Sequence, residues 1–283
     1  MSHVADLAPP IEQELLPEVG AASRWGDRLR RYVPAAIVFI LALVLWEAAV
    51  NVFHIEGFLL PKPSVIAATF VAELSVVFPA GLFTMREAVG GFVLGSLLGM
   101  VIALVTARWA GISEGMMPFA IAVNSTPIVA LAPIMNQWFG ITNPLGKMSI
   151  VAVIVFFPVM INTVKGLTQV DAGALELMRS YAATEFAVLF RVRIPNALPY
   201  VFSALKVAST LSVIGAIVSE YFGGSREALG VYISQQAALF HFAEAWAAII
   251  IACLMGISFY AMLLWLERLI MPWHVSIRAT EEG

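Results

Sequence analysis

The sequence predicts an all-α integral membrane protein with six transmembrane helices, and three observations lead to this fold class. Of its 283 residues, 60% are hydrophobic and 12% are charged, about half of the roughly 25% charge usual in soluble domains. The apolar residues gather in six stretches long enough to cross about 30 Å of hydrocarbon as helices. Lys and Arg concentrate in alternate connecting segments, as the positive-inside rule requires.

The first predicted span covers residues 32–52 and follows a polar tail of mixed charge, residues 1–31. A cleavable signal peptide would have an apolar core of about 7–15 residues. The apolar run is longer than that. We therefore expect an uncleaved first span and a cytoplasmic N-terminal tail.

The remaining chain supplies five more spans and ends in a short tail. The predicted spans are residues 86–106, 116–139, 147–167, 199–222 and 245–266. Residues 65–78 have the apolar spacing of a separate helix lying on the membrane face, too interrupted to span. The membrane domain is expected over residues 32–270 and a cytoplasmic C-terminal tail over residues 271–283.

The distribution of positive charge predicts that both termini lie in the cytoplasm. Six spans place the two termini on one side of the membrane. That side holds Arg24, Arg28, Arg30, Arg31, Arg108, Lys165, Arg179, Arg191, Arg193, Arg268 and Arg278, and the opposite side holds Lys62, Arg86, Lys147 and Arg226. The segment at residues 168–198 is therefore expected in the cytoplasm. The protein as a whole is expected in a cell inner membrane.

Composition and motifs exclude several other classes of protein. The net charge of -3 argues against a nucleic-acid partner, and the single Cys253 permits no intrachain disulfide. The stretch GITNPLGKMS resembles a phosphate loop, but five residues separate Gly140 from Gly146 and Met148 replaces the required Ser or Thr. His241 with Glu244 is an isolated pair. We expect neither a metal site nor catalytic activity nor a cofactor in this chain.

Small residues recur at every fourth position in two spans. The second span carries Gly91, Gly95 and Gly99. The fifth span carries Ala204, Ala208, Ser212 and Ala216, and the next residue at this four-residue spacing is Glu220. Such stripes let two helix backbones approach closely. We interpret the glycines as a packing device, with a sliding surface for a moving helix as the alternative.

Polar residues and prolines in the third span predict a translocation pathway. In NSTPIVALAPIMNQWFG, prolines remove backbone donors, so the helix should be kinked or broken. Irregular backbone at membrane depth is tolerated where it lies beside a water-filled cavity. Glu220 could line the same path or lie at the interface. The candidate pathway residues are Asn124, Ser125, Thr126, Pro127, Asn136, Ser212, Ala216 and Glu220.

The expected cytoplasmic segment contains a charged stretch, ELMRSYAATEFAVLFRVRIPNALP, at residues 176–199. Its apolar stripe predicts two short helices with a bend at residues 182–184, where Thr184 caps the second helix. Pro195 and Pro199 are expected to end this element and to start the fifth span. One interpretation is an amphipathic helix on the lipid surface.

The same stretch resembles the cytoplasmic "EAA" loop of binding-protein-dependent ABC importer permeases. Glu176 matches the acid of that loop, and residues 194–199, IPNALP, match its ending without a gap. Leu177 and Met178 replace the two alanines, and Ala182 stands where glycine is usual. Because glycine would allow a left-handed turn, we expect Ala182 to force a tighter or more continuous bend.

The resemblance extends from the first span to the last. LLPKPSVI, STPIVALAPIMNQWFG, FFPVMINTVKGL and ALKVASTLSVIGAIVSEYFGG are similar to the subgroup that includes nitrate, sulfonate, taurine, riboflavin and pyrimidine-precursor importers. This implies a type I ABC importer permease fold with a cytoplasmic coupling helix between spans four and five. It also implies a second permease copy, two cytoplasmic ATPase subunits that hold ATP and magnesium, and an extracytoplasmic substrate-binding protein.

The resemblance further implies which residues would couple to the ATPase. They are Glu176, Arg179, Ala182, Thr184, Glu185, Phe186, Leu189, Phe190, Arg193, Pro195 and Pro199. Phe186, Leu189 and Phe190 would be apolar anchors. The motif SVIGAIVSEYFGG favours riboflavin or a pyrimidine precursor as cargo over nitrate, sulfonate or taurine. A secondary transporter driven by an ion gradient is the alternative that a broken third span permits.

Overall fold

The computed structural model describes residues 21–107, 115, 118 and 128–272. Within these residues the protein is entirely helical, with no strand, which confirms the all-α part of the predicted fold class. Five of the described helices are long and apolar enough to cross a membrane: Val33–Val52, Pro63–Thr106, Pro144–Thr168, Glu185–Tyr221 and Phe242–Ile270. The predicted third span lies mostly outside the described residues. Its described part is a 3-10 turn, Ile128–Leu131, followed by α4, Ala132–Phe139.

Helix α1, Ala21–Val52, belongs to two structural units that are described separately, Met1–Leu45 and the unit that begins at Trp46. In the second unit, the Glu47 carboxylate accepts hydrogen bonds from the Ser64 backbone N–H at 3.0 Å and from the Ser64 hydroxyl at 2.6 Å. The ring of Trp46 packs edge-on against that of Trp246, with 5.4 Å between the ring centroids. The end of α1 thus satisfies a free donor at the start of the next helix.

Helix α2, Pro63–Thr106, is one continuous helix of 44 residues. The helix predicted at residues 65–78 is present, but it is the first part of α2 and continues without interruption into the second predicted span. Val77 and Ala80 are buried in a cluster with α9, Leu229–Ala238, and α10, Phe242–Ile270, so packing supports the helix through this region. Pro79 lies inside it, where the missing N–H removes a single backbone hydrogen bond.

The glycine stripe of α2 packs against the backbone of α5, Pro144–Thr168. A Cβ atom on Gly91 would lie 2.6 Å from the Met148 carbonyl oxygen, and one on Gly95 would lie 2.9 Å from the Cα of Ala152. Real Cβ atoms essentially never show such contacts. The packing interpretation of this stripe is confirmed, because only glycine permits two helices to lie this close.

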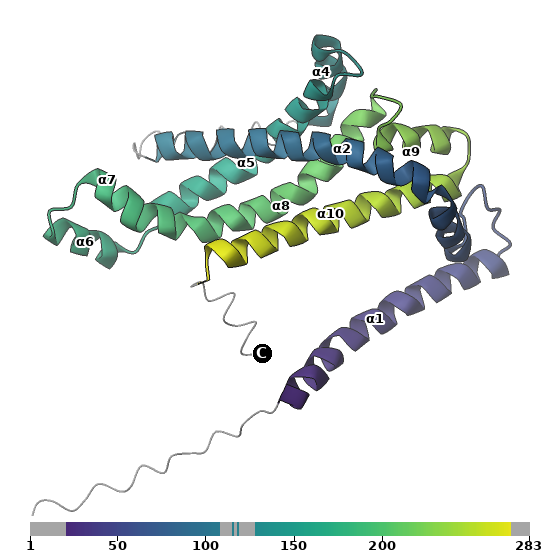
Figure 1. Cartoon of the computed structure of the whole chain (residues 1–283), viewed down its shortest axis with the longest axis horizontal. Helices are drawn as coiled ribbons and strands as arrows, with labels where there is room; N and C mark the ends of the chain where they lie inside the picture. Colours follow the sequence, from purple (N-terminus) through teal and green to yellow (C-terminus); the bar gives the residue numbers. More distant parts are fainter. Residues whose placement is uncertain (1–20, 108–114, 116–117, 119–127, 273–283) are drawn as a thin grey trace, which may run out of the picture. The chain divides into compact units, whose positions relative to one another are not determined.

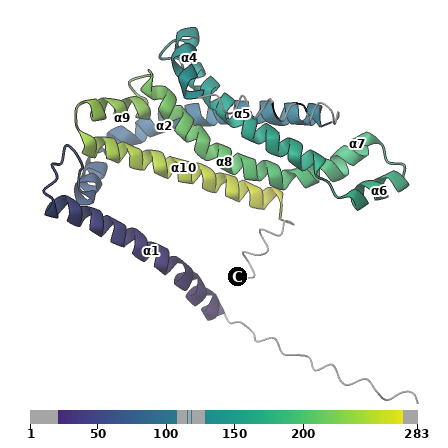
Figure 2. The ribbon, with the colours of Figure 1, turned by 180° about the vertical axis from the view of Figure 1, so that it is seen from behind.

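The main core of the bundle lies between α2, α5, α10 and α8, Ile194–Tyr221. Ala204, Ala208 and Ala216 of the second small-residue stripe are buried in it. Figures 1 and 2 show α6, Ala172–Ser180, and α7, Glu185–Val188, at one end of this bundle, and α4 and α9 at the other. The charged stretch and the predicted pathway residue Asn136 of α4 therefore occupy opposite ends.

Candidate functional site

The charged stretch folds into two capped helices separated by a bend, as predicted, although the second of them continues into α8. The Asp171 carboxylate accepts a hydrogen bond from the Ala174 N–H at 2.9 Å at the start of α6. The Thr184 hydroxyl accepts one from the Ala187 N–H at 3.3 Å at the start of α7. Each side chain satisfies an N–H that a helix start leaves free. We call residues 172–193 the docking element.

The bend in the docking element is a left-handed turn at Ala182, which has φ +51°. The Ala182 N–H donates to the Arg179 carbonyl at 2.9 Å, and the Ala183 N–H donates to the Met178 carbonyl at 3.0 Å. The expectation of a tighter or more continuous bend is therefore wrong. These hydrogen bonds hold alanine in the conformation that glycine would adopt, at a cost of about 1 kcal/mol.

The second half of the docking element runs into α8 without a break. A π-helical turn, Leu189–Arg193, joins α7 to α8, so the chain stays helical over Glu185–Tyr221. The prediction that Pro195 and Pro199 end the element is wrong, because the helix continues through both. Pro195 lies in the first turn of α8, so the prediction that it starts the fifth span is confirmed. The Asn196 amide holds this turn against α5 by donating to the Gly166 carbonyl at 2.8 Å.

Four large apolar side chains of the docking element are exposed, and we call them the exposed apolar patch. They are Leu177, Tyr181, Phe186 and Phe190, with exposures of 57%, 74%, 71% and 52%. The rings of Phe186 and Phe190 lie 4.6 Å apart. Leu189, which sequence reasoning grouped with them, is instead half-buried against Ala107, Leu167 and Ala197. Sequence reasoning missed Leu177 and Tyr181, although their four-residue spacing places them on one helix face.

The charged side chains of the docking element are of two kinds. Glu176, Arg179, Glu185 and Arg191 are exposed. Arg193 is half-buried, and its guanidinium lies 3.5 Å from the Ala107 carbonyl oxygen. Thus Arg193 ties the element to the end of α2, whereas the other four are free to meet a partner.

A network of buried polar side chains occupies the other end of the bundle. The Glu220 carboxylate, 1% exposed, accepts a hydrogen bond from the Thr84 hydroxyl at 2.7 Å and another from the Gly230 N–H at 2.6 Å. The Leu229 N–H donates to the Thr84 oxygen at 2.9 Å. These bonds connect α2, α8 and the start of α9.

Lys147 extends the network to α4 and α5. Its ammonium group donates to the Asn136 side-chain oxygen at 2.8 Å and to the Ile141 carbonyl. The Asn136 amide donates to the Phe222 carbonyl at 3.1 Å. Lys147 is 1% exposed. It is therefore a buried cation, and sequence reasoning counted it only as a loop charge.

Comparison with known proteins identifies the family. Residues 95–273 match the model of the family described as "Binding-protein-dependent transport system inner membrane component". The chain belongs to this family. The permease is 29% identical to the formylaminopyrimidine transport permease protein ThiX of Halalkalibacterium halodurans, over 84% of this chain and 94% of the relative. It is also 29% identical to the riboflavin transport system permease protein RibX of Chloroflexus aurantiacus, over 93% of this chain and 100% of the relative.

A solved structure shares the fold of the permease. One chain of a crystal structure of an amino acid ABC transporter with histidines aligns with a TM-score of 0.57 and 21% sequence identity. The alignment covers 70% of this chain and 95% of that chain. The fold of an ABC importer permease, as a multi-pass membrane protein, is thereby confirmed.

Four of the predicted pathway residues are buried within one copy of the permease. They are Asn136, Ser212, Ala216 and Glu220. Ser212 donates to the Ser209 carbonyl at 2.7 Å, and Ala216 packs in the main core. Asn136 and Glu220 hold the polar network together. The other four, Asn124, Ser125, Thr126 and Pro127, lie outside the described residues. A pathway role for these residues stays a prediction.

Glu87 is the second acidic residue of the network, and sequence reasoning missed it. Its side chain is 3% exposed, and its neighbours include the Glu220 carboxyl and Lys147. Within the described part of the chain, its Oε2 atom has no hydrogen-bond partner. The available signal was an acid inside a predicted span, because such residues are rare and mark functional positions.

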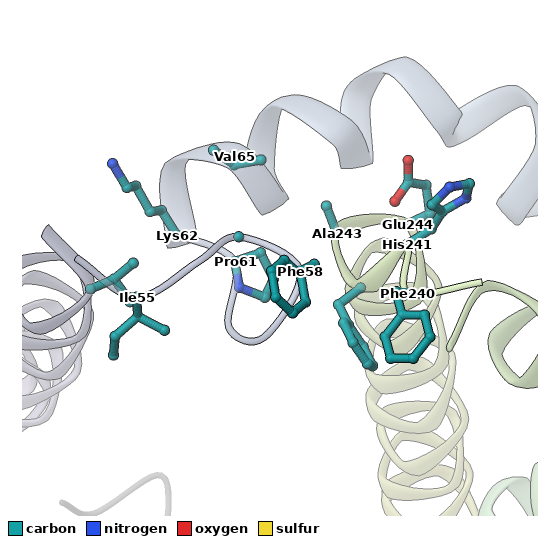
Figure 3. Close-up of a pocket in the computed structure, with 12 residues that line it drawn as sticks. Ile55, Phe58, Pro61, Lys62, Val65, Phe240, His241, Ala243 and Glu244 are labelled. Atoms are coloured by element: carbon teal, nitrogen blue, oxygen red, sulfur yellow. The ribbon is translucent and has the colours of Figure 1, made fainter. Parts of the chain in front are cut away.

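A pocket of about 350 Å³ lies between the loop after α1 and the start of α10. Figure 3 shows Phe58 and Phe240 on two sides of it, and His241 next to Glu244. His241 Nδ1 lies 3.1 Å from the Gln236 side-chain oxygen. The described residues contain no group of three or more His, Cys, Asp or Glu that could hold a metal ion. Nothing at this pocket therefore points to a metal.

Proposed function

We propose that the permease couples to a cytoplasmic ABC ATPase through the docking element and forms part of the path for a small solute. The observation that carries this proposal is the exposed apolar patch on an element that continues as the helix Glu185–Tyr221. Large aromatic side chains exposed to water are costly, and they are typical anchors of protein interfaces. A partner groove would remove this patch from water.

The proposed interface combines apolar anchors with orienting charges. Phe186 and Phe190, whose rings are in contact, would fill a groove on the ATPase, and the exposed Leu177 and Tyr181 would add further apolar contacts. The exposed Glu176, Arg179 and Glu185 would set its orientation, because rim charges contribute more to specificity than to affinity. An amphipathic helix on a lipid surface would also bury the patch, but it would give no reason for the continuous connection to α8.

The mechanism follows from this connection. When two ATPase subunits close on ATP and magnesium, they would draw together the docking elements of two permease copies. Each α8 would tilt with its docking element, which would switch access from one side of the membrane to the other. The rigid link makes this possible, since a flexible loop would absorb the movement. In this proposal the chain itself hydrolyses no ATP.

The proposed cargo is a small heteroaromatic solute such as riboflavin or a pyrimidine precursor. Two relatives at 29% identity are named for formylaminopyrimidine and riboflavin transport, whereas the taurine permease protein TauC of Escherichia coli is 21% identical. Nitrate, sulfonate and taurine remain the other cargo classes. An extracytoplasmic binding protein would deliver the solute, and both termini would face the cytoplasm.

Reconstitution in proteoliposomes tests this function. The permease is purified with its ATPase and supplied with the binding protein and a panel of radiolabelled solutes: riboflavin, a formylaminopyrimidine, nitrate, an alkanesulfonate and taurine. We expect uptake of a heteroaromatic solute that requires ATP and all three components. Uptake by the permease alone under an ion gradient would refute the proposal and support a secondary transporter.

A further inference from the structure

The buried network at the end of the bundle opposite the docking element contains more acid than base. Within the described residues, Glu87 of α2, Glu220 of α8 and Lys147 of α5 lie in one cluster, and the neutral phenol of Tyr221 lies beside Glu220. Asn136 of α4 and the backbone N–H groups at Leu229 and Gly230 are uncharged. Two carboxylates and one ammonium would leave a net negative charge in a water-excluded site, which is expensive.

The hydrogen bonds show which carboxyl carries the negative charge. Both oxygens of Glu220 accept bonds, at 2.7 Å from Thr84 and 2.6 Å from the Gly230 N–H. Short bonds of this kind are typical of an ionised acceptor. The Thr84 hydroxyl donates to Glu220, and its oxygen accepts from the Leu229 N–H. Glu220 thus accepts two hydrogen bonds from the described residues, as an ionised carboxylate does.

Glu87 has the opposite environment. Its Oε2 atom is buried and has no hydrogen-bond partner among the described residues, and the polar group within its reach is the acceptor Glu220. An ionised carboxylate in that position would lack donors and would face a like charge. A protonated carboxyl could instead donate to Glu220.

We propose that Glu87 is a resident proton-binding residue that donates a hydrogen bond to ionised Glu220, so that Glu87, Glu220 and Lys147 form an electrically neutral triad. The Glu87–Glu220 bond would join α2 to α8, and the other bonds of Glu220 reach Thr84 and the start of α9. Lys147 of α5 binds Asn136 of α4 and supplies the balancing positive charge. Glu87 is a positioning residue in this arrangement. Its proton permits two buried acids to share one cation.

The proposal predicts unequal effects of neutral substitutions on the purified full-length permease in lipid nanodiscs. Glu87→Gln replaces a protonated acid by an uncharged group of similar shape, so the thermal midpoint should fall by less than about 3 °C. Glu220→Gln and Lys147→Met each leave one buried charge without its partner, so each should lower the midpoint by roughly 10 °C. The variant that combines Glu220→Gln with Lys147→Met should show a smaller fall in thermal midpoint than the sum of the two single falls. Glu227→Gln, at an exposed glutamate, is the control and should change nothing.

Infrared spectroscopy of the same samples at neutral pH detects the proton on a carboxyl group directly. This signal would not change on substitution of Glu87 if Glu87 had only a structural role. The carbonyl band of a protonated carboxylic acid should be present in the parent protein and in Glu227→Gln, and should lose intensity in Glu87→Gln. A band that survives Glu87→Gln unchanged would overturn the proposal. So would a Glu87→Gln variant as unstable as Glu220→Gln, or one that does not fold. Neither measurement depends on cargo or on the ATPase, so the result stands apart from the proposed transport function.

Discussion

Replacing Phe186 by Ala should weaken binding of the ATPase to the permease. The Phe186 side chain is 71% exposed, and a buried aromatic side chain removes about 150–250 Å² from water. The partner could therefore cover about 140 Å² of it, corresponding to roughly 3.5 kcal/mol at 25 cal/mol per Å². Alanine retains part of this area. We expect a loss of about 2–3 kcal/mol, equivalent to about 30- to 150-fold weaker binding.

The measurement is a titration of the ATPase against the permease in nanodiscs. Phe53→Ala is the matched control, because Phe53 is 75% exposed but lies in the loop after α1, which is predicted to be extracytoplasmic. The control should bind as the parent does. Binding of the Phe186→Ala variant within twofold of the parent would refute the docking surface, and so would an equal loss in the control. Loss of lipid binding without loss of ATPase binding would favour the amphipathic-helix interpretation.

Substitutions at Thr184, Ala182 and Gly95, with Gly57→Ala as a control, test the local structure through thermal unfolding of the permease. Thr184→Ala should cost about 1 kcal/mol, since it removes the cap of α7; an unchanged midpoint would show that the cap contributes nothing. Because φ is +51° at Ala182, Ala182→Gly should be neutral or stabilising and Ala182→Val should destabilise the permease. A higher thermal midpoint for the Val variant than for the Gly variant would contradict a left-handed turn. Gly95→Val should destabilise the permease by roughly 3 kcal/mol or more through overpacking against Ala152. Gly57→Ala should be tolerated, because a Cβ atom there meets nothing within 4 Å. Equal effects of the two substitutions would refute the close packing at Gly95.

The sequence predicts those features of this permease that depend on local pattern. Hydrophobic runs predicted the helices, and the four-residue glycine step predicted the close packing of Gly95. Thr184 was predicted as a cap because its chemistry and its place before a helical run suffice. Each of these signals is contained within a few turns of one helix.

Features that depend on distant contacts were not predictable. Thr84 and Glu220 are 136 positions apart and still share a hydrogen bond, and no local signal pairs them. Leu189 and Phe186 lie three residues apart in one helix, but Leu189 is half-buried because Ala107, Leu167 and Ala197 pack against it, and these residues are distant in the sequence. The start of α2 stayed helical because Val77 is buried against α9 and α10, a contact that a hydropathy profile does not contain.

The unbroken helix from the docking element to the buried triad has a mechanical consequence. Its 37 residues have a length of about 55 Å at 1.5 Å per residue. If one end is held, a tilt of about 5° moves the other end by roughly 5 Å, more than the 4.0–4.5 Å that separates side chains in contact. A small closure between two ATPase subunits would therefore suffice to break or make a whole layer of contacts at the far side of the membrane.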